Sequence, residues 1–261
     1  MSLPPIGDGA PLVFVAGPCV IEPGDGLFRV AEALAALPVP VVFKASFDKA
    51  NRSSADAYRG PGLDAGLEAL AQVRRRFDLP LLTDVHTPAQ CAPAAEVVDV
   101  LQIPAFLCRQ TDLVQAAAAT GRVVNLKRGQ FLDPRRVHLA VEKAAGRAWV
   151  TERGTSFGHG DLVFDPRALV WMRGAGAPVL FDATHSVQVP GGDAPTTGGR
   201  PEMVLPLARA AAAVGVDGVY AEVHPDPPRA LSDAATQLTP AAFATLVEQV
   251  LAVDAARRAA A

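Results

Sequence analysis

The chain has 261 residues, half of them hydrophobic, and a formal net charge of −3. This length suits one large α/β domain or two small ones, and this composition can supply a substantial core. The small negative charge gives no support for a nucleic-acid or anionic-membrane partner, and no apolar run approaches the length of a membrane span. The first ten residues lack the basic start and apolar stretch of a signal peptide, so we expect a cytoplasmic protein. Three widely spaced cysteines, Cys19, Cys91 and Cys108, predict reduced thiols rather than a disulfide framework.

Short apolar runs rich in Val, Ile and Leu alternate along the chain with longer helical patterns. The runs are continuous rather than alternating in polarity, as expected for parallel strands that are covered on both faces. We predict eight strands, at residues 12–17, 41–45, 80–85, 97–103, 122–127, 148–153, 178–184 and 218–223.

The segments between these runs carry helix signals. Residues 26–37 and 64–77 repeat apolar residues at three- and four-residue spacing. Pro88, Pro134, Pro166 and Pro201 fit first helical turns, Asp133 and Asp165 fit N-caps, and a last helix is expected from about Thr239 and Pro240. Eight strands that alternate with helices predict one (β/α)8 TIM barrel, a single catalytic domain over residues 1–261. An open doubly wound sheet is the rival, but its GxGxxG first turn is absent.

Polar or charged residues follow every predicted strand, whereas the strand bodies are apolar. In a parallel barrel these strand ends meet at one mouth, where the active site forms. Because unpaired charges are costly to bury, such convergence predicts a functional site rather than packing. In chain order the residues are Cys19, Lys44, Asp84 with His86, Gln102 with Arg109, Lys127, Arg153, His185, Glu222 with His224, and then Asp233.

One subset of these residues is cationic. It comprises Lys44, Lys49, Lys127 and Arg153, with Arg52 and Arg109 nearby. Most Lys and Arg residues are solvated surface charges, but Lys44 and Lys127 each directly end an apolar strand. A mildly acidic protein with a basic mouth indicates a multiply charged, anionic small-molecule substrate.

A second subset contains residue types that bind metals: Cys19, His185, Glu222 and Asp233. None is close to another in sequence, so their spacing is a weak metal signal. Cys19 could equally be a small buried hydrophobic residue, and His185 a general acid or a hydrogen-bonded core residue. The residue types alone leave a shared metal site open. We expect Cys91 and Cys108 to be structural, and we assign no chemistry to His138 or His159.

Several long motifs resemble one enzyme family. They read FKASFDKANRSS, AYRGPGL, TDVH, LQIPAFLCRQTDLV, FDATHSVQVPGG and EVHPDP. From about Val13 to Leu238 the chain resembles the 3-deoxy-D-manno-octulosonate 8-phosphate (KDO8P) synthases. The resemblance implies a homotetramer of (β/α)8 barrels that condenses phosphoenolpyruvate with D-arabinose 5-phosphate and water, with release of phosphate. The product is the eight-carbon sugar acid of bacterial lipopolysaccharide.

The resemblance also implies roles for individual residues. Lys44, Lys49, Lys127 and Arg153 would hold the phosphate and carboxylate of phosphoenolpyruvate, with Ser46, Gln102 and Gln188 also binding substrate. Asn51, Arg52 and Ser53 would bind the sugar phosphate, helped by Arg109 from a neighbouring subunit, and Asp84 would lie close to the sugar. The catalytic residues would be Cys19, His185, Asp233, Lys44 and Asp84.

The family has metal-dependent and metal-independent branches. The metal-independent branch is expected to carry Asn at the position of Cys19 and usually Pro at that of Gly129, and the LSDAATQL segment also resembles the metal-dependent branch. The resemblance thus implies one divalent ion (Zn, Fe(II), Mn or Co) held by Cys19, His185, Glu222 and Asp233. Thr197 stands where Ser is usual, and His159 with Gly160 where Tyr or Asn would be more familiar. We expect neither departure to alter the reaction.

Three alternatives stay open. The sister enzyme that uses erythrose 4-phosphate (3-deoxy-D-arabino-heptulosonate 7-phosphate synthase) shares the barrel, but it usually carries a KPRT-type segment in place of KANRSS. A Schiff-base aldolase could use Lys127, yet that reaction explains neither Cys19 nor the additional cations. A sugar-phosphate sensor would need an output domain, and no part of the sequence resembles one.

Overall fold

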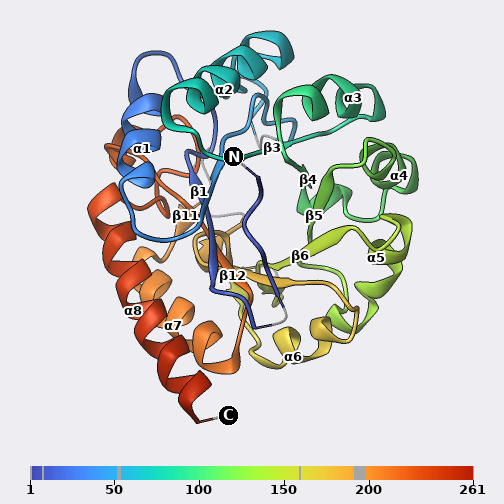
Figure 1. The fold of residues 1–261 in the computed structure, drawn as a ribbon, viewed down its shortest axis with the longest axis vertical. Coiled ribbons are helices and arrows are strands. Elements are labelled where there is room, and N and C mark those ends of the chain that lie inside the picture. The colour runs from blue at the N-terminus through green and yellow to red at the C-terminus, as the bar shows by residue number, and fades with distance from the viewer. Residues whose placement is uncertain (1, 8, 52–53, 159, 191–197, 261) are drawn as a thin grey trace.

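A closed barrel of parallel strands forms the centre of the molecule, and helices form a ring around it (Figure 1). The computed structural model describes residues 2–7, 9–51, 54–158, 160–190 and 198–260. The strands close in the order β1-β12-β9-β6-β5-β4-β3-β2, and all neighbouring pairs are parallel. Their bounds are β1 Val13–Gly17, β2 Val41–Lys44, β3 Leu81–Asp84, β4 Val100–Ile103, β5 Val123–Lys127, β6 Ala148–Glu152, β9 Val179–Asp182 and β12 Gly218–Glu222.

The first seven α-helices connect consecutive barrel strands, α8 follows the last strand, and all pack on the outside of the barrel. They are α1 Gly26–Ala35, α2 Leu63–Phe77, α3 Pro88–Val97, α4 Thr111–Ala119, α5 His138–Lys143, α6 Arg167–Arg173, α7 Val204–Val214 and α8 Pro240–Ala259. Two small antiparallel hairpins lie outside the barrel sheet. They are β7 Thr155–Ser156 with β8 Leu162–Val163, and β10 Gln188–Val189 with β11 Gly198–Gly199. The predicted single (β/α)8 barrel is therefore confirmed. None of the helices in the described part of the chain is long and apolar enough to cross a membrane.

Seven of the eight predicted strands match the barrel strands to within two residues at either end. The prediction of a strand over 97–103 was wrong at its start, because Val97 is the last residue of α3 and Val98 caps that helix with an extended backbone. β4 consequently begins only at Val100. The end of α3 and the start of β4 are both apolar, so hydrophobicity alone does not mark the boundary between this helix and this strand.

The four prolines that were expected in first helical turns have three different positions in the structure. Pro88 occupies the first turn of α3 as predicted, whereas Pro166 is the N-cap of α6 and not a first-turn residue. Pro134 and Pro201 begin short 3-10 turns that precede α5 and α7. Asp165 still acts as a cap, because its side chain accepts the backbone N–H of Arg167 at 3.0 Å.

Two apolar layers make up the core. The larger lies between the strands and the helices, and the smaller lies inside the barrel. The inner layer consists of Val13, Val15, Val42, Leu82, Val100, Trp149, Leu180 and Tyr220, with Leu3 and Ile6 packed against it. Each of the eight lies within the first three residues of its strand. The N-terminal half of the barrel interior is therefore filled, and only the C-terminal half is left for polar side chains.

Candidate active site

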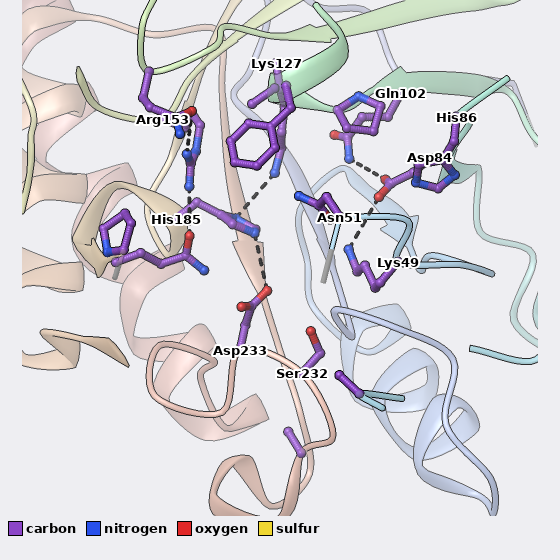
Figure 2. Close-up of a pocket in the computed structure, with 18 of the residues that line it drawn as sticks. Lys49, Asn51, Asp84, His86, Gln102, Lys127, Arg153, His185, Ser232 and Asp233 are labelled. Carbon is purple, nitrogen blue, oxygen red and sulfur yellow. Dashed lines mark hydrogen bonds and ion pairs between the residues drawn. The ribbon is translucent and has the colours of Figure 1, made fainter. Parts of the chain in front are cut away.

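A cavity of about 260 Å³ opens at the C-terminal ends of the barrel strands. Figure 2 shows its side chains converging from several strand ends, with Lys127 between a group around Arg153 and His185 and a group around Asp84. Nine of the predicted site residues line it: Lys49, Asn51, Asp84, Gln102, Lys127, Arg153, His185, Gln188 and Asp233.

Four further predicted residues lie one layer behind the cavity wall. Cys19, Lys44, Ser46 and Glu222 are completely buried. Cys19, Ser46 and Glu222 contact lining residues through their side chains, and Lys44 contacts Glu222; Cys19 Sγ, for example, lies 3.0 Å from Asp233 Oδ2. Arg109 is exposed and does not line the cavity of its own chain. Arg52 and Ser53 lie outside the described residues, as do His159 and Thr197.

Lys127 and Arg153 supply positive charge to one side of the cavity. Lys127 Nζ lies 2.6 Å from Asp182 Oδ2, and burial lowers the pKa of Lys127 even though Asp182 opposes the shift. Arg153 donates to Gln188 Oε1 at 2.8 Å and to Gln130 Oε1 at 3.0 Å. These two bonds use only two of the five N–H donors of Arg153, so this guanidinium can also bind an anionic ligand.

Lys44 is the most deeply buried cation of the site. Its Nζ donates to Glu222 Oε1 at 2.8 Å and to the carbonyl of Cys19 at 2.9 Å. Burial alone would lower the pKa of Lys44, but the nearby carboxylate of Glu222 outweighs it and the pKa is raised. The ammonium group therefore keeps its charge inside the barrel.

Asp84 forms the opposite side of the cavity. Its carboxylate accepts from Ser46 Oγ at 2.8 Å and from Gln102 Nε2 at 2.5 Å, with Lys49 Nζ at 3.4 Å. Burial would raise the pKa of Asp84, but Lys49 and Lys44 outweigh it and hold that pKa well below its ordinary value. A fixed negative charge thus faces the cationic side.

A chain of side-chain hydrogen bonds crosses the barrel interior beneath the cavity. Thr151 Oγ1 donates to Asn125 Oδ1 at 2.7 Å, and Asn125 Nδ2 donates to Gln102 Oε1 at 2.8 Å. Gln102 then donates to Asp84. These residues come from β6, β5, β4 and β3, so the chain links four neighbouring strands at one level.

Cys19, Glu222 and Asp233 form the part of the site that could hold a metal ion. One ligand atom from each lies within 4.8 Å of the others. His185 Nε2 lies 3.5 Å from Glu222 Oε1 and 3.8 Å from Asp233 Oδ2. The second oxygen of Glu222, Oε2, is buried with no hydrogen-bond partner among the described residues. Cys19, Glu222 and Asp233 thus form a close group with His185 beside their carboxylates, and a thiol, an imidazole and two carboxylates suit a borderline divalent cation.

Two features of the surrounding residues also fit a metal ion at this position. Asp182 Oδ2 lies 2.8 Å from His185 Nδ1, which orients the ring with Nε2 towards Glu222 and Asp233, as outer carboxylates orient metal-bound histidines. Burial, then the negative charges of Asp233 and Glu222, raise the pKa of the Cys19 thiol well above its ordinary value. A thiolate at Cys19 therefore requires a compensating cation.

Asp182, Ser232 and Gln130 are site residues that sequence reasoning missed. Asp182 lies inside the apolar run 178–184, and an acidic residue within a buried strand was the signal that could have found it. Ser232 Oγ lies 2.9 Å from Cys19 Sγ, and Gln130 contacts Arg153. Neither of these two carries a sequence signal, because only the loop conformations bring them to the site.

The barrel and the polar cavity at its mouth define a (β/α)8-barrel enzyme. The chain matches the model of the DAHP synthetase I family over residues 4–257 and belongs to that family. It is 53% identical over 257 residues to a 2-dehydro-3-deoxyphosphooctonate aldolase of Verminephrobacter eiseniae, with 93% of this chain and 90% of the relative covered. It is 51% identical over 261 residues to the enzyme of the same description from Trichlorobacter lovleyi, with 97% and 96% covered. The resemblance drawn from the motifs is thereby confirmed.

Proposed function

We propose that the chain condenses phosphoenolpyruvate with D-arabinose 5-phosphate and water to give 3-deoxy-D-manno-octulosonate 8-phosphate and inorganic phosphate. The observation that carries the proposal is the similarity, over nearly the full length of both chains, to relatives described as 2-dehydro-3-deoxyphosphooctonate aldolases. The cavity supports it, because two phosphorylated substrates need several fixed cations and Lys49, Lys127 and Arg153 line its wall.

The chemistry places clear demands on these residues. The methylene carbon of phosphoenolpyruvate attacks the aldehyde carbon of the sugar, and water adds to the neighbouring carbon as positive charge develops there. Cleavage of the carbon–oxygen bond then releases phosphate. Lys127 and Arg153, with Gln188, are suited to hold the phosphate and carboxylate, which suppresses repulsion and keeps the reacting carbons together. Asp84, which stays ionised, is suited to accept hydrogen bonds from the sugar.

We also propose that Cys19, His185, Glu222 and Asp233 hold one divalent cation, either Zn, Fe(II), Mn or Co. When bound, this ion supplies a Lewis acid that polarises the sugar aldehyde or acidifies the attacking water. The close grouping of Cys19, Glu222 and Asp233 supports the assignment, and so does Glu222 Oε2, which has no hydrogen-bond partner among the described residues. His185 completes the donor set, with its ring oriented by Asp182.

An assay of two aldoses side by side tests the reaction. Purified enzyme with phosphoenolpyruvate should release phosphate rapidly with arabinose 5-phosphate and far more slowly with erythrose 4-phosphate. The product is identified by mass spectrometry. A preference for erythrose 4-phosphate would refute the proposal, and the alternative enzyme of heptulosonate synthesis would take its place.

Removal of divalent ions tests the metal proposal. A chelator followed by desalting should abolish turnover, and Mn or Co should restore it. The Co-loaded protein should show thiolate-to-cobalt charge-transfer absorption that Cys19→Ser removes, a readout independent of activity. Full activity in protein shown by elemental analysis to be metal-free would contradict the proposal.

A further inference from the structure

A buried ion pair between Arg128 and Glu152 adjoins the cationic side of the cavity. Arg128 directly follows Lys127, and Glu152 directly precedes Arg153. Successive side chains along a strand point to opposite faces. Lys127 and Arg153 accordingly line the cavity, whereas Arg128 and Glu152 do not. The pair therefore lies immediately behind two of the groups that face the substrates.

The Arg128 guanidinium is completely buried, and its five N–H groups make six hydrogen-bond contacts, one N–H of Nη2 being shared between two acceptors. Two of them join Nε and Nη2 to the two carboxylate oxygens of Glu152, at 2.5 Å each. The other four reach the loops after β5 and β6, at Gly129 O (3.1 Å), Leu132 O (2.5 Å), Gly154 O (3.0 Å) and Thr155 Oγ1 (2.9 Å). Glu152 Oε1 also accepts the backbone N–H of Gly154 at 2.7 Å. One guanidinium thus ties together both loops that leave these strands.

This arrangement fits geometric control better than added stability. Both side chains are removed from water, and a buried ion pair often contributes no more stability than an apolar pair of similar volume. What an apolar pair cannot do is bond to the main chain of both loops at fixed angles. A lysine could not do so either, because it lacks the planar fork of donors.

The tied loops lead directly to the cavity. Gln130, in the first loop, accepts from Arg153 Nη1 at 3.0 Å, and its carbonyl accepts the N–H of Ser156 in the second loop at 3.0 Å. Glu152 also balances the charge of Arg128, which would otherwise add to the positive charge of Lys127 and Arg153. The pair therefore affects both the position and the electrostatic surroundings of these two cations.

We infer that the Arg128–Glu152 ion pair positions Lys127 and Arg153 to bind the phosphate and carboxylate of phosphoenolpyruvate. The inference rests on the proposed function. Arg128 and Glu152 are positioning residues, because they act through the two cations and contact no substrate themselves. The sugar phosphate is expected to lie elsewhere, near Asn51, so its binding should be much less affected.

Binding of phosphoenolpyruvate, measured by calorimetry without any aldose, tests the inference. Arg128→Lys and Glu152→Gln should each weaken this binding about tenfold or more, because small displacements of binding groups are costly. In turnover assays the KM for phosphoenolpyruvate should rise in parallel, while the KM for arabinose 5-phosphate stays within about twofold of its original value. A purely structural role would not separate the two substrates.

The Arg74–Asp99 pair supplies a control, although its side chains are more exposed, at 34% and 12% against 0% for Arg128 and Glu152. It is also short, at 2.5 Å, but Asp99 accepts the N–H of Leu81 at the start of β3, the opposite end of the barrel. Asp99→Asn should lower the melting temperature without changing phosphoenolpyruvate affinity. If Arg128→Lys and Glu152→Gln behave like Asp99→Asn, the inference is wrong.

A double variant covers the case in which the single variants do not fold. Arg128→Met with Glu152→Leu leaves no unpaired buried charge. Folded protein with weakened phosphoenolpyruvate binding supports the inference. Unchanged binding overturns it, and so does a failure to fold, which would assign the pair to stability. If the unaltered enzyme binds phosphoenolpyruvate but makes no octulosonate phosphate, the proposed function fails and the comparison of affinities still stands.

Discussion

The charge on Asp84 links the site to the stability of the fold. Lys49 and Lys44 hold the pKa of Asp84 well below its ordinary value of about 3.9. A carboxylate with a depressed pKa in the folded state stabilises the protein above its unfolded pKa, and this contribution is lost as the pH falls through the folded pKa.

In Asp84→Asn, the unfolding free energy should therefore fall less steeply as the pH is lowered than it does in the unaltered protein. We expect the difference in unfolding free energy between the unaltered protein and Asp84→Asn to shrink as the pH is lowered below about 4. Urea unfolding between pH 5 and pH 2 measures it. A difference that stays constant over this range would show that the charge on Asp84 does not stabilise the fold.

Some residues of the site could be predicted from the sequence, and others could not. Lys44 could be predicted because a charged residue at the C-terminal end of an apolar strand lies at the mouth of a parallel barrel, whereas the role of Cys19 was implied only by the family resemblance. Asp182 was missed because it lies within such a run, where an acidic residue is acceptable only beside partners such as Lys127 and His185. Those partners lie 55 and 3 residues away, and only the fold shows that all three meet.

The eight barrel strands were predictable as elements because each is buried on both faces and so reads as a continuous apolar run. The two hairpins were not predictable. Each strand of β7–β8 and β10–β11 has only two residues, too short for any periodicity. Hairpin β7–β8 nevertheless contains Thr155, one of the groups bonded to Arg128.

The junction of β1 and β2 depends on a residue without a side chain. Gly17 ends β1 with φ +152°, and a Cβ there would lie 2.0 Å from the carbonyl oxygen of Lys44. Gly17→Ala should separate the two strand ends that carry Cys19 and Lys44. We expect a loss of about 1–3 kcal/mol in unfolding free energy, measured by urea unfolding, together with lower activity.

Gly26→Ala is the control for this prediction. A Cβ at Gly26, in the first turn of α1, would meet Pro225 only at an ordinary 3.6 Å. This change should be neutral or slightly stabilising, because Ala favours a helix more than Gly. Equal effects of the two substitutions would contradict the steric argument.

At the scale of the whole molecule, the exposed position of Arg109 becomes informative. Arg109 is exposed and does not line the cavity of its own chain, and large apolar side chains are also exposed, including Phe131 (58%) and Phe157 (76%). These observations support the proposal of a homotetramer in which Arg109 serves a neighbouring site. Light scattering should give the mass of four chains.

Complementation tests the shared site. Arg109→Ala and Asp233→Ala should each lose most activity when pure. Assemblies that contain both variants should regain part of it, since an intact metal-ligand set can then receive an intact Arg109 from its neighbour. If mixed assemblies stay inactive, or if Arg109→Ala is fully active, Arg109 does not act across the interface.

The hydrogen bonds beneath the cavity all point one way. Thr151 donates to Asn125, Asn125 to Gln102, and Gln102 to Asp84, so each amide is oriented by the next. The negative charge at the end sets the polarity of the whole relay, and neighbouring bonds of this kind reinforce one another. Because Asp84 is the final acceptor, its ionised carboxylate fixes how the amides of Gln102 and Asn125 are turned on the two neighbouring strands.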